Sequence, residues 1–280
     1  MVPPHSDVAL RPAFGEWDLS DRLILGRLAL GLGRAVALAG AALADGKPPC
    51  ELKNLGDATV SAVLDGRTLA LNDGREVRLA GIEVADAAKA ALQGLIDGRE
   101  VALARLGPET DRYGRLVAVV TAKPQPLDIE NSLQHALLAQ GMARVSAHVG
   151  NLGCAAALWQ AERKAREAGL GVWANPHYVT RHAGDFAGIL AIRGRFAVVE
   201  GRVESVRESG GTIYVNFGRR WSEDFTVTVA KRNEHSFTAA GLPLSKLAGQ
   251  RVRIRGTIEE RGGPWVEASA PEQIEVVEHN

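Results

Sequence analysis

The sequence predicts a mainly β protein of the α+β class, in which a small five-stranded barrel with packed helices is followed by a second small β-barrel. Three observations support this. Short alternating apolar segments separated by Gly-containing turns occupy residues 58–120. Two longer helical patterns follow, and each stops at a glycine. Strand-like segments then return after residue 196.

The first barrel is predicted to begin with a hairpin. Residues 58–64 alternate between apolar and polar side chains, and Asp65-Gly66 is a turn signal before the next apolar segment. A second turn, Asn72 to Arg75, leads to the third strand. Strands are expected at residues 58–64, 68–71, 76–80, 101–104 and 116–120.

Three helices are expected beside these strands. The first opens at Asp86, a good capping residue, and runs to Ile96 before Asp97-Gly98. The second covers about residues 129–140 and stops at Gly141, and the third covers about 154–168 and stops at Gly169.

The chain after this region is expected to form a separate β body. Residues 176–190 contain proline and glycine without a clear period and are predicted to be a linker. Residues 191–278 contain five strand-like segments and one short helix near 237–247, which predicts a small barrel of the OB type. Its strands are expected near residues 196–203, 212–217, 225–229, 251–256 and 265–268.

The composition is that of a globular protein with a sizeable core. Of the 280 residues, 46% are hydrophobic and 24% are charged, and the 33 basic residues balance the 33 acidic ones. A protein that holds polyanions by its overall charge is usually basic. Any contact with nucleic acid is therefore expected from a local cluster.

Residues 1–50 are expected to be an N-terminal arm that contains a signal segment. An apolar run from Ala35 ends in Ala42-Leu43-Ala44, an A-x-A pattern, and arginines precede it. We expect cleavage near Ala44 and export, to the periplasm in a bacterium, and no stable membrane span in the mature chain. A cytoplasmic arm is the alternative, because the positive region is unusually long. Export would permit a disulfide between Cys50 and Cys154.

A cluster of charged residues carries the predicted chemistry. Arg78, Glu83 and Asp86 are closely spaced, and Thr110-Asp-Arg-Tyr-Gly-Arg115 follows. Two guanidiniums can bind a phosphodiester through paired hydrogen bonds. One carboxylate can hold a divalent cation, and another can activate a water molecule.

These segments resemble the staphylococcal nuclease-like (thermonuclease) family over about residues 56–175. Asp65-Gly-Arg-Thr68 lies where the family has D-G-D-T, and residues 78–86 lie where it has R-x4-D-T-P-E. Residues 110–115 match T-D-x-Y-G-R. Residues 136–145 match A-L-x-x-Q-G-x-A-x-V, and residues 161–173 match the final helix and its G-x-W close. The resemblance implies a five-stranded OB barrel with packed helices, and the region after 190 is similar to an OB-like extension found on exported relatives.

The resemblance also implies a function. The family hydrolyses phosphodiesters of DNA or RNA with Ca²⁺ held by carboxylates, a glutamate base and two arginines on the phosphate. By position, Arg78 and Arg115 match the arginines, Glu83 a metal ligand and Asp86 the base. Asp65 is a second candidate metal ligand, and Tyr113 and the arginines are candidate substrate-binding residues.

The sequence departs from this pattern at the metal and base positions. Arg67 replaces the expected aspartate ligand, and a cation there opposes Ca²⁺ binding. Asp86 has a shorter side chain than glutamate and is alternatively the N-cap of the next helix. Asp65 is alternatively only the first residue of a turn.

Two functional hypotheses follow. The first is an altered metal-assisted nuclease with weak or absent classical activity, and the second is a non-catalytic module that binds phosphate, single-stranded DNA or RNA, or a protein. The C-terminal barrel interleaves aromatic and basic side chains, which is the composition of a single-strand stacking surface: Tyr214, Phe217, Arg219, Arg220, Trp221, Phe225, Lys231 and Arg232. Tyr214 and Phe217 are expected on opposite faces of one strand, so at least one of them belongs to the core. Protein contact or a structural role is the alternative.

Overall fold

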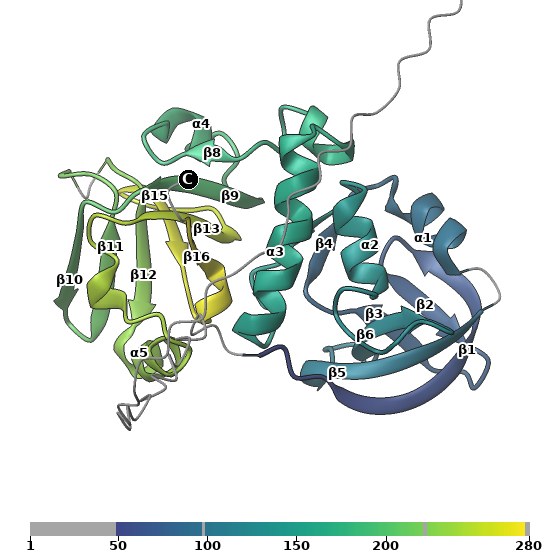
Figure 1. The fold of residues 1–280 in the computed structure, drawn as a ribbon. Coiled ribbons are helices and arrows are strands. Elements are labelled where there is room, and N and C mark those ends of the chain that lie inside the picture. Colours follow the sequence, from purple (N-terminus) through teal and green to yellow (C-terminus); the bar gives the residue numbers. More distant parts are fainter. Residues whose placement is uncertain (1–48, 97–98, 221–222, 278–280) are drawn as a thin grey trace, which may run out of the picture. The chain divides into compact units, whose positions relative to one another are not determined.

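The computed structural model describes residues 49–96, 99–220 and 223–277, which fall within one compact unit of the chain (Figure 1). The predicted signal segment and its cleavage point lie outside the described residues. Within the described ranges, no helix is long and apolar enough to cross a membrane.

The predicted first barrel is confirmed as a closed sheet of five strands in the order β1-β2-β3-β6-β5. The parallel pair β3–β6 closes it, and the other neighbours are antiparallel. Branched aliphatic side chains such as Val77, Val101 and Val120 share the inner face of the sheet and are buried. The strands are β1 (Lys53–Asp65), β2 (Thr68–Leu71), β3 (Glu76–Leu79), β5 (Glu100–Thr110) and β6 (Leu116–Ala122).

Three helices accompany the barrel (Figure 1). They are α1 (Ala88–Ile96), α2 (Leu133–Ala139) and α3 (Leu152–Glu167). Ser132 and Asn151 cap α2 and α3 by accepting the amide N–H of His135 and Cys154. A short ladder that was not predicted pairs β4 (Ile82–Val84), which follows β3 in the chain, with β7 (Ala143–Val145), which lies between α2 and α3.

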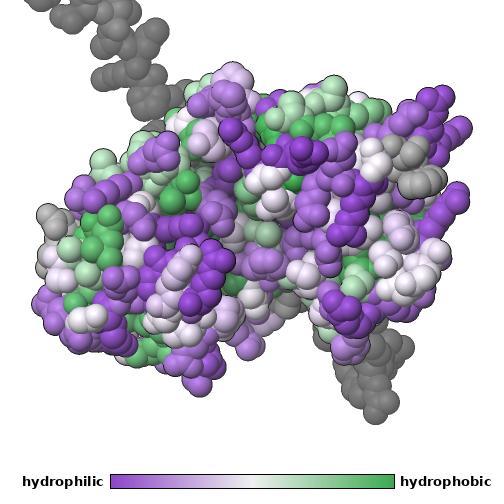
Figure 2. Space-filling model, turned by 180° about the vertical axis from the view of Figure 1, so that it is seen from behind, coloured by the Kyte–Doolittle hydropathy of each residue, from purple (hydrophilic) through white to green (hydrophobic). Residues whose placement is uncertain are grey.

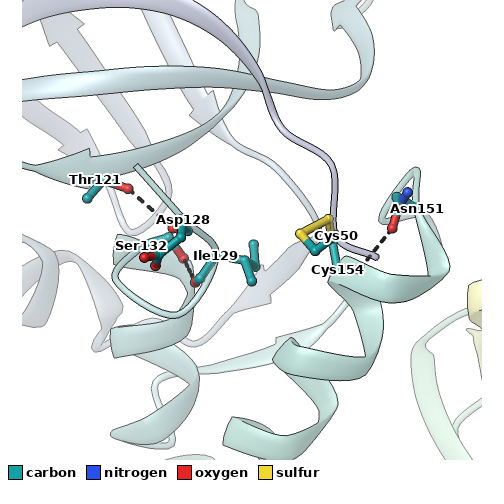
Figure 3. Close-up of a disulfide and its surroundings, with 7 residues drawn as sticks. All are labelled: Cys50, Thr121, Asp128, Ile129, Ser132, Asn151 and Cys154. Atoms are coloured by element: carbon teal, nitrogen blue, oxygen red, sulfur yellow. Dashed lines mark hydrogen bonds between the residues drawn. A yellow bond between two sulfur atoms is a disulfide. The ribbon is translucent and has the colours of Figure 1, made fainter. Parts of the chain in front are cut away.

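A disulfide joins Cys50, just before β1, to Cys154 in the first turn of α3 (Figure 3). The two residues are 104 positions apart, so the bond closes a loop that contains all five strands of the first barrel. Asn151 caps the helix one turn earlier, where Figure 3 draws its bond to the amide of Cys154. The start of α3 is therefore fixed by a covalent bond and a cap.

The second β body consists of two sheets around one core. The five-stranded sheet has the order β10-β11-β12-β15-β14, and the four-stranded sheet has the order β16-β13-β9-β8. Its core includes Val199, Phe225, Val227 and Ile254. The strands are β8 (Arg181–His182), β9 (Phe196–Arg202), β10 (Ser205–Ser209), β11 (Thr212–Asn216), β12 (Thr226–Ala230), β13 (Arg251–Thr257), β14 (Glu259–Arg261), β15 (Gly263–Glu267) and β16 (Ile274–Val276).

The segment 176–190 does more than link the two bodies. It contains β8 and α4 (Phe186–Leu190), and β8 pairs in parallel with β9. The predicted helix at 237–247 is shorter, because α5 covers Glu234–Ala239 and Gly241 follows with a positive φ of 78°.

A buried ion-pair network joins α3 to the second body. The side chains of Glu162 on α3 and Arg255 on β13 are 0% exposed and form an ion pair. Arg255 Nη1 also lies 2.8 Å from Oε2 of Glu275, which is 4% exposed. Burial alone would raise the pKa of Glu275, but the charges of Arg255 and Arg253 outweigh it and lower that pKa below its ordinary value. The charges are thus compensated within the network.

Away from these cores, hydrophilic side chains cover much of the face shown in Figure 2, with smaller hydrophobic areas between them.

Candidate phosphate-binding site

Arg67 and Arg78 are brought together by the β2–β3 hairpin and the turn before it. Arg67 lies in the turn between β1 and β2, and its carbonyl accepts the N–H of Leu79 at 2.8 Å. Arg78 on β3 is paired with Thr68 on β2, the residue after Arg67. The barrel register therefore places both arginines at the same end of this hairpin.

Arg115 reaches the same region from the turn before β6. Strands β3 and β6 run in parallel with Arg78 opposite Val117, so Arg115 lies just before the strand that adjoins Arg78. Gly114 has a φ of 78°, which explains the glycine in the Asp-Arg-Tyr-Gly-Arg turn.

Asp111 holds Arg115 in place. Its Oδ1 accepts the amide N–H of Tyr113 at 2.9 Å and of Arg115 at 3.1 Å. Its Oδ2 accepts from Arg115 Nε at 2.9 Å and lies 2.7 Å from Nη2. Desolvation would raise the pKa of Asp111, but these hydrogen bonds lower it below its ordinary value. In the part of the chain that the structure describes, no hydrogen bond is found for Nη1 of Arg115, which can donate to another acceptor.

Tyr113 projects from this turn and is 67% exposed. The guanidiniums of Arg112 and Arg115 lie 4.9 and 5.1 Å from its ring centroid. An exposed aromatic ring beside a phosphate-binding arginine is suited to stacking on a nucleobase.

Arg67 forms an ion pair with the predicted metal ligand Glu83. Arg67 Nη1 lies 2.8 Å from Glu83 Oε2, and both side chains are partly buried. The Arg67 amide also donates to Asp65 Oδ1 at 2.8 Å. Burial would raise the pKa of Asp65, but this bond and the Arg67 charge contribute to lowering it. Both candidate metal ligands therefore interact with Arg67.

Arg78 differs from Arg67 and Arg115 in its contacts. Within the described residues it forms no ion pair, although Arg67 and Arg115 each form one. Burial and the positive charges of Arg67 and Arg115 lower the pKa of Arg78, while Glu83 and Asp111 partly oppose this effect. The guanidinium stays protonated at neutral pH, so Arg78 presents a positive charge to an anion.

The described residues do not fit the Ca²⁺ site that the family resemblance implies. Ca²⁺ takes six to eight oxygen ligands. In the described part of the chain, no group of three or more His, Cys, Asp or Glu side chains is placed to hold a metal ion. The carboxylate of Glu83 is already paired with the guanidinium of Arg67.

Asp86 lies apart from these contacts. It is exposed in the turn before α1, and the helix begins at Ala88, whose N–H bonds to the carbonyl of Ala85 at 3.0 Å. Asp86 is two residues before the helix, so it is not the predicted N-cap. Among the described residues we find no hydrogen bond to its carboxylate.

A comparison with protein families identifies the first body. Residues 74–175 match the model of the family described as "Staphylococcal nuclease homologue". This segment is a staphylococcal nuclease-like domain. The match and the closed barrel confirm the predicted resemblance and fold. The matched range begins after Asp65 and Arg67. The family match suggests nucleic acid as the general class of ligand. A search of curated proteins found no significant match.

The sequence prediction missed a set of polar residues on the second body. Thr226 and Thr228 on β12 alternate with the core residues Val227 and Val229, so they share the opposite face of the sheet. That alternation was the available signal. Tyr214 and Phe217 do lie in different environments, since Phe217 contacts Phe225 at 5.0 Å between ring centroids and Tyr214 is exposed.

Proposed function

We propose that the staphylococcal nuclease-like domain binds phosphodiesters of single-stranded DNA or RNA through Arg78 and Arg115, with at most weak Ca²⁺-assisted hydrolysis. The observation that carries this proposal is the 2.8 Å ion pair between Arg67 and Glu83. It places a fixed cation on the carboxylate that a metal ion would need.

Two arginines with different contacts support the proposal that the site binds phosphate. Asp111 orients Arg115 through two contacts to one carboxylate oxygen, which reduces the entropy lost when a phosphate binds. Among the described residues Arg78 forms no ion pair, and the charges of Arg67 and Arg115 repel its guanidinium, so a phosphate anion would relieve this repulsion. Guanidiniums bind phosphate oxygens through paired, charge-assisted hydrogen bonds.

The hydrolytic half of the site lacks comparable support. A metal ion in such a reaction polarises the phosphoryl group and lowers the pKa of a bound water molecule. Arg67 cannot supply a ligand for that ion. Asp86 is exposed and belongs to the turn before α1, and no hydrogen bond from another described residue orients its carboxylate as a base. Removing both contributions leaves charge stabilisation by the arginines alone.

Hydrolysis of single-stranded DNA and RNA, measured with Ca²⁺ and then with EDTA, tests this proposal. We expect little cleavage by the wild type and a gain in Ca²⁺-dependent cleavage for Arg67→Asp, which replaces the blocking cation with a ligand. Arg67→Met is the matched control, since it removes the cation without adding a ligand. Strong, EDTA-sensitive cleavage by the wild type that Arg115→Ala abolishes would contradict the proposal.

We also propose that the chain is exported and cleaved near Ala44. The Cys50–Cys154 disulfide supports this proposal, because such bonds form and persist in oxidising compartments. Sequencing the N-terminus of the mature protein from its native host tests it. A mature chain that retains Met1 in the cytoplasm would contradict it.

A further inference from the structure

The second body carries a groove that the nuclease-like site does not use. It has a volume of about 910 Å³ and is lined by strands β10, β11, β12, β14 and β15 with their adjoining loops. This volume is within the range of small-molecule sites, about 300–1,000 Å³. The core lies on the other face of these strands, where Ile213, Val215 and Val227 are buried.

The groove floor consists of two rows of side chains across the sheet. The strand register places Asn216 opposite both Ser205 and Thr226, and Thr226 opposite Trp265. In the next row, Tyr214 lies between Arg207 and Thr228, and Thr228 is opposite Glu267. Each row thus combines hydrogen-bonding side chains with one aromatic residue.

The polar floor is recessed. Asn216, Thr226 and Thr228 are 9%, 7% and 6% exposed, although they lie on the face away from the core. Asn216 Nδ2 donates to Ser205 Oγ at 3.3 Å, and Thr226 Oγ1 donates to Asn216 Oδ1 at 3.5 Å. These long bonds use only part of the capacity of the amide and hydroxyl groups, so the floor can exchange hydrogen bonds with a ligand.

The charges that line the groove are balanced. Three arginines, at 207, 219 and 261, accompany three carboxylates, Glu204, Asp224 and Glu267. Arg219 is paired with Glu204 at 3.2 Å. Two basic residues nearby are paired as well: Arg220 contacts Glu223, and Lys231 contacts Glu208 and Glu234. A polyanion would gain little from this surface, which argues against the predicted single-strand stacking role.

The aromatic residues give the groove an apolar component. Tyr214 is 36% exposed, and the guanidinium of Arg261 covers the Trp265 ring at 3.3 Å from its centroid. Arg261 is itself largely exposed, so its side chain can move off that ring. Aromatic faces beside hydroxyl, amide and carboxylate groups match a sugar ring, which has apolar C–H faces and hydroxyls around its edge.

We propose that this groove binds an uncharged oligosaccharide. The balanced charge excludes a strong preference for polyanions, and the recessed Ser, Thr and Asn side chains provide both donors and acceptors for sugar hydroxyls. The proposal is independent of the function of the nuclease-like domain, since it uses no residue of the arginine site.

The test is a calorimetric titration of the full chain with maltohexaose, cellohexaose and chitohexaose, and with a twelve-residue oligothymidylate as the polyanion. We expect saturable binding of at least one of the three sugars. Thr228→Val keeps the shape and removes the hydroxyl, so it should weaken that binding about tenfold, and Tyr214→Ala should weaken it at least as much. Arg75→Ala, in an exposed turn of the nuclease-like domain, is the control and should leave it unchanged.

Three results would overturn the proposal. One is no binding of any of the three sugars by a protein with a wild-type circular dichroism spectrum. Another is sugar binding that Thr228→Val and Tyr214→Ala leave intact. The third is oligothymidylate binding that Tyr214→Ala or Arg207→Ala weakens, because it would assign the groove to nucleic acid.

Discussion

Replacing Arg255 with methionine should destabilise the protein strongly. Arg255 is fully buried between Glu162 and Glu275, which are 0% and 4% exposed. Methionine preserves much of the volume but removes the cation that bridges the two buried carboxylates. Glu162 then keeps its contact with Arg166 at 3.5 Å, and Glu275 keeps its contacts with Arg253 and Arg163 at 3.0 and 3.6 Å. Breaking a buried ion pair in this way costs about 3–5 kcal/mol. Natural domains are stable by only about 5–15 kcal/mol, so the loss is a large fraction of the total.

Differential scanning calorimetry measures this loss. For a unit of this size, 1 kcal/mol corresponds to about 2–4 °C, so the melting temperature should fall by about 6–20 °C. Arg193→Met is the matched control, because Arg193 pairs with Glu260 at an exposed site and should change stability by less than about 1 kcal/mol.

A double-mutant cycle separates the network from a simple packing defect. Adding Glu162→Gln to Arg255→Met removes the negative charge of one of the two buried carboxylates and should recover part of the lost stability. Glu162 Oε1 also accepts the amide N–H of Val145 at 2.9 Å, and glutamine keeps an oxygen for this bond. If Arg255→Met melts within 2 °C of the wild type, the ion-pair network does not stabilise the contact between α3 and the second body.

Three further predictions concern other parts of the fold. Cys154→Ser and Cys50→Ser should each cost about 4–5 kcal/mol in urea unfolding, because the disulfide closes a loop of about a hundred residues, and the double variant should cost no more than either alone. The pKa of Glu275 is lowered from its ordinary value of 4.5, so its ionised carboxylate stabilises the folded state above pH 4.5, and this stability is lost as the pH falls through the lowered pKa. The melting temperature should therefore decrease when the pH is lowered from 4.5, and it should decrease less for Glu275→Gln. Asn151→Ala should cost about 1 kcal/mol by loss of the α3 cap, whereas Asn151→Ser should restore most of it; equal stability of the two variants would contradict the capping role.

The barrel was predictable because its signals are local. Asp65-Gly66 and Asn72 to Arg75 mark turns, and alternating apolar residues between them mark strands, so β2 was predicted with its observed bounds. The three-residue strands β4 and β7 were missed, because segments this short carry too little periodicity and depend on pairing with each other.

Helix starts were less predictable than helix existence. Asp86 has a favourable capping side chain, yet α1 begins two residues later at Ala88. Capping preferences are weak compared with the packing of Ala88, Leu92 and Ile96, which are buried. The buried partner of Glu162 was also inaccessible to sequence reasoning, because Arg255 is 93 residues away.

The candidate site was predictable in its members but not in its contacts. Sequence identified Arg67 as a cation at a metal-ligand position, and the structure adds that it pairs with Glu83. The structure also distinguishes two arginines: Arg115 is paired with Asp111, whereas Arg78 forms no ion pair among the described residues. These distinctions depend on side-chain geometry, which the motif alone does not define.

The affinity of the protein for a fluorescent single-stranded oligonucleotide in EDTA shows whether the arginine site binds phosphodiesters without a metal ion. We expect binding to persist in EDTA, and we expect Arg78→Ala to weaken it by about 10- to 100-fold, which corresponds to the loss of a hydrogen bond to a charged group. Arg75→Ala is the control, since Arg75 pairs with Asp73 at an exposed turn and should have little effect. Binding that requires Ca²⁺, or that Arg78→Ala leaves unchanged, would contradict a metal-free arginine site.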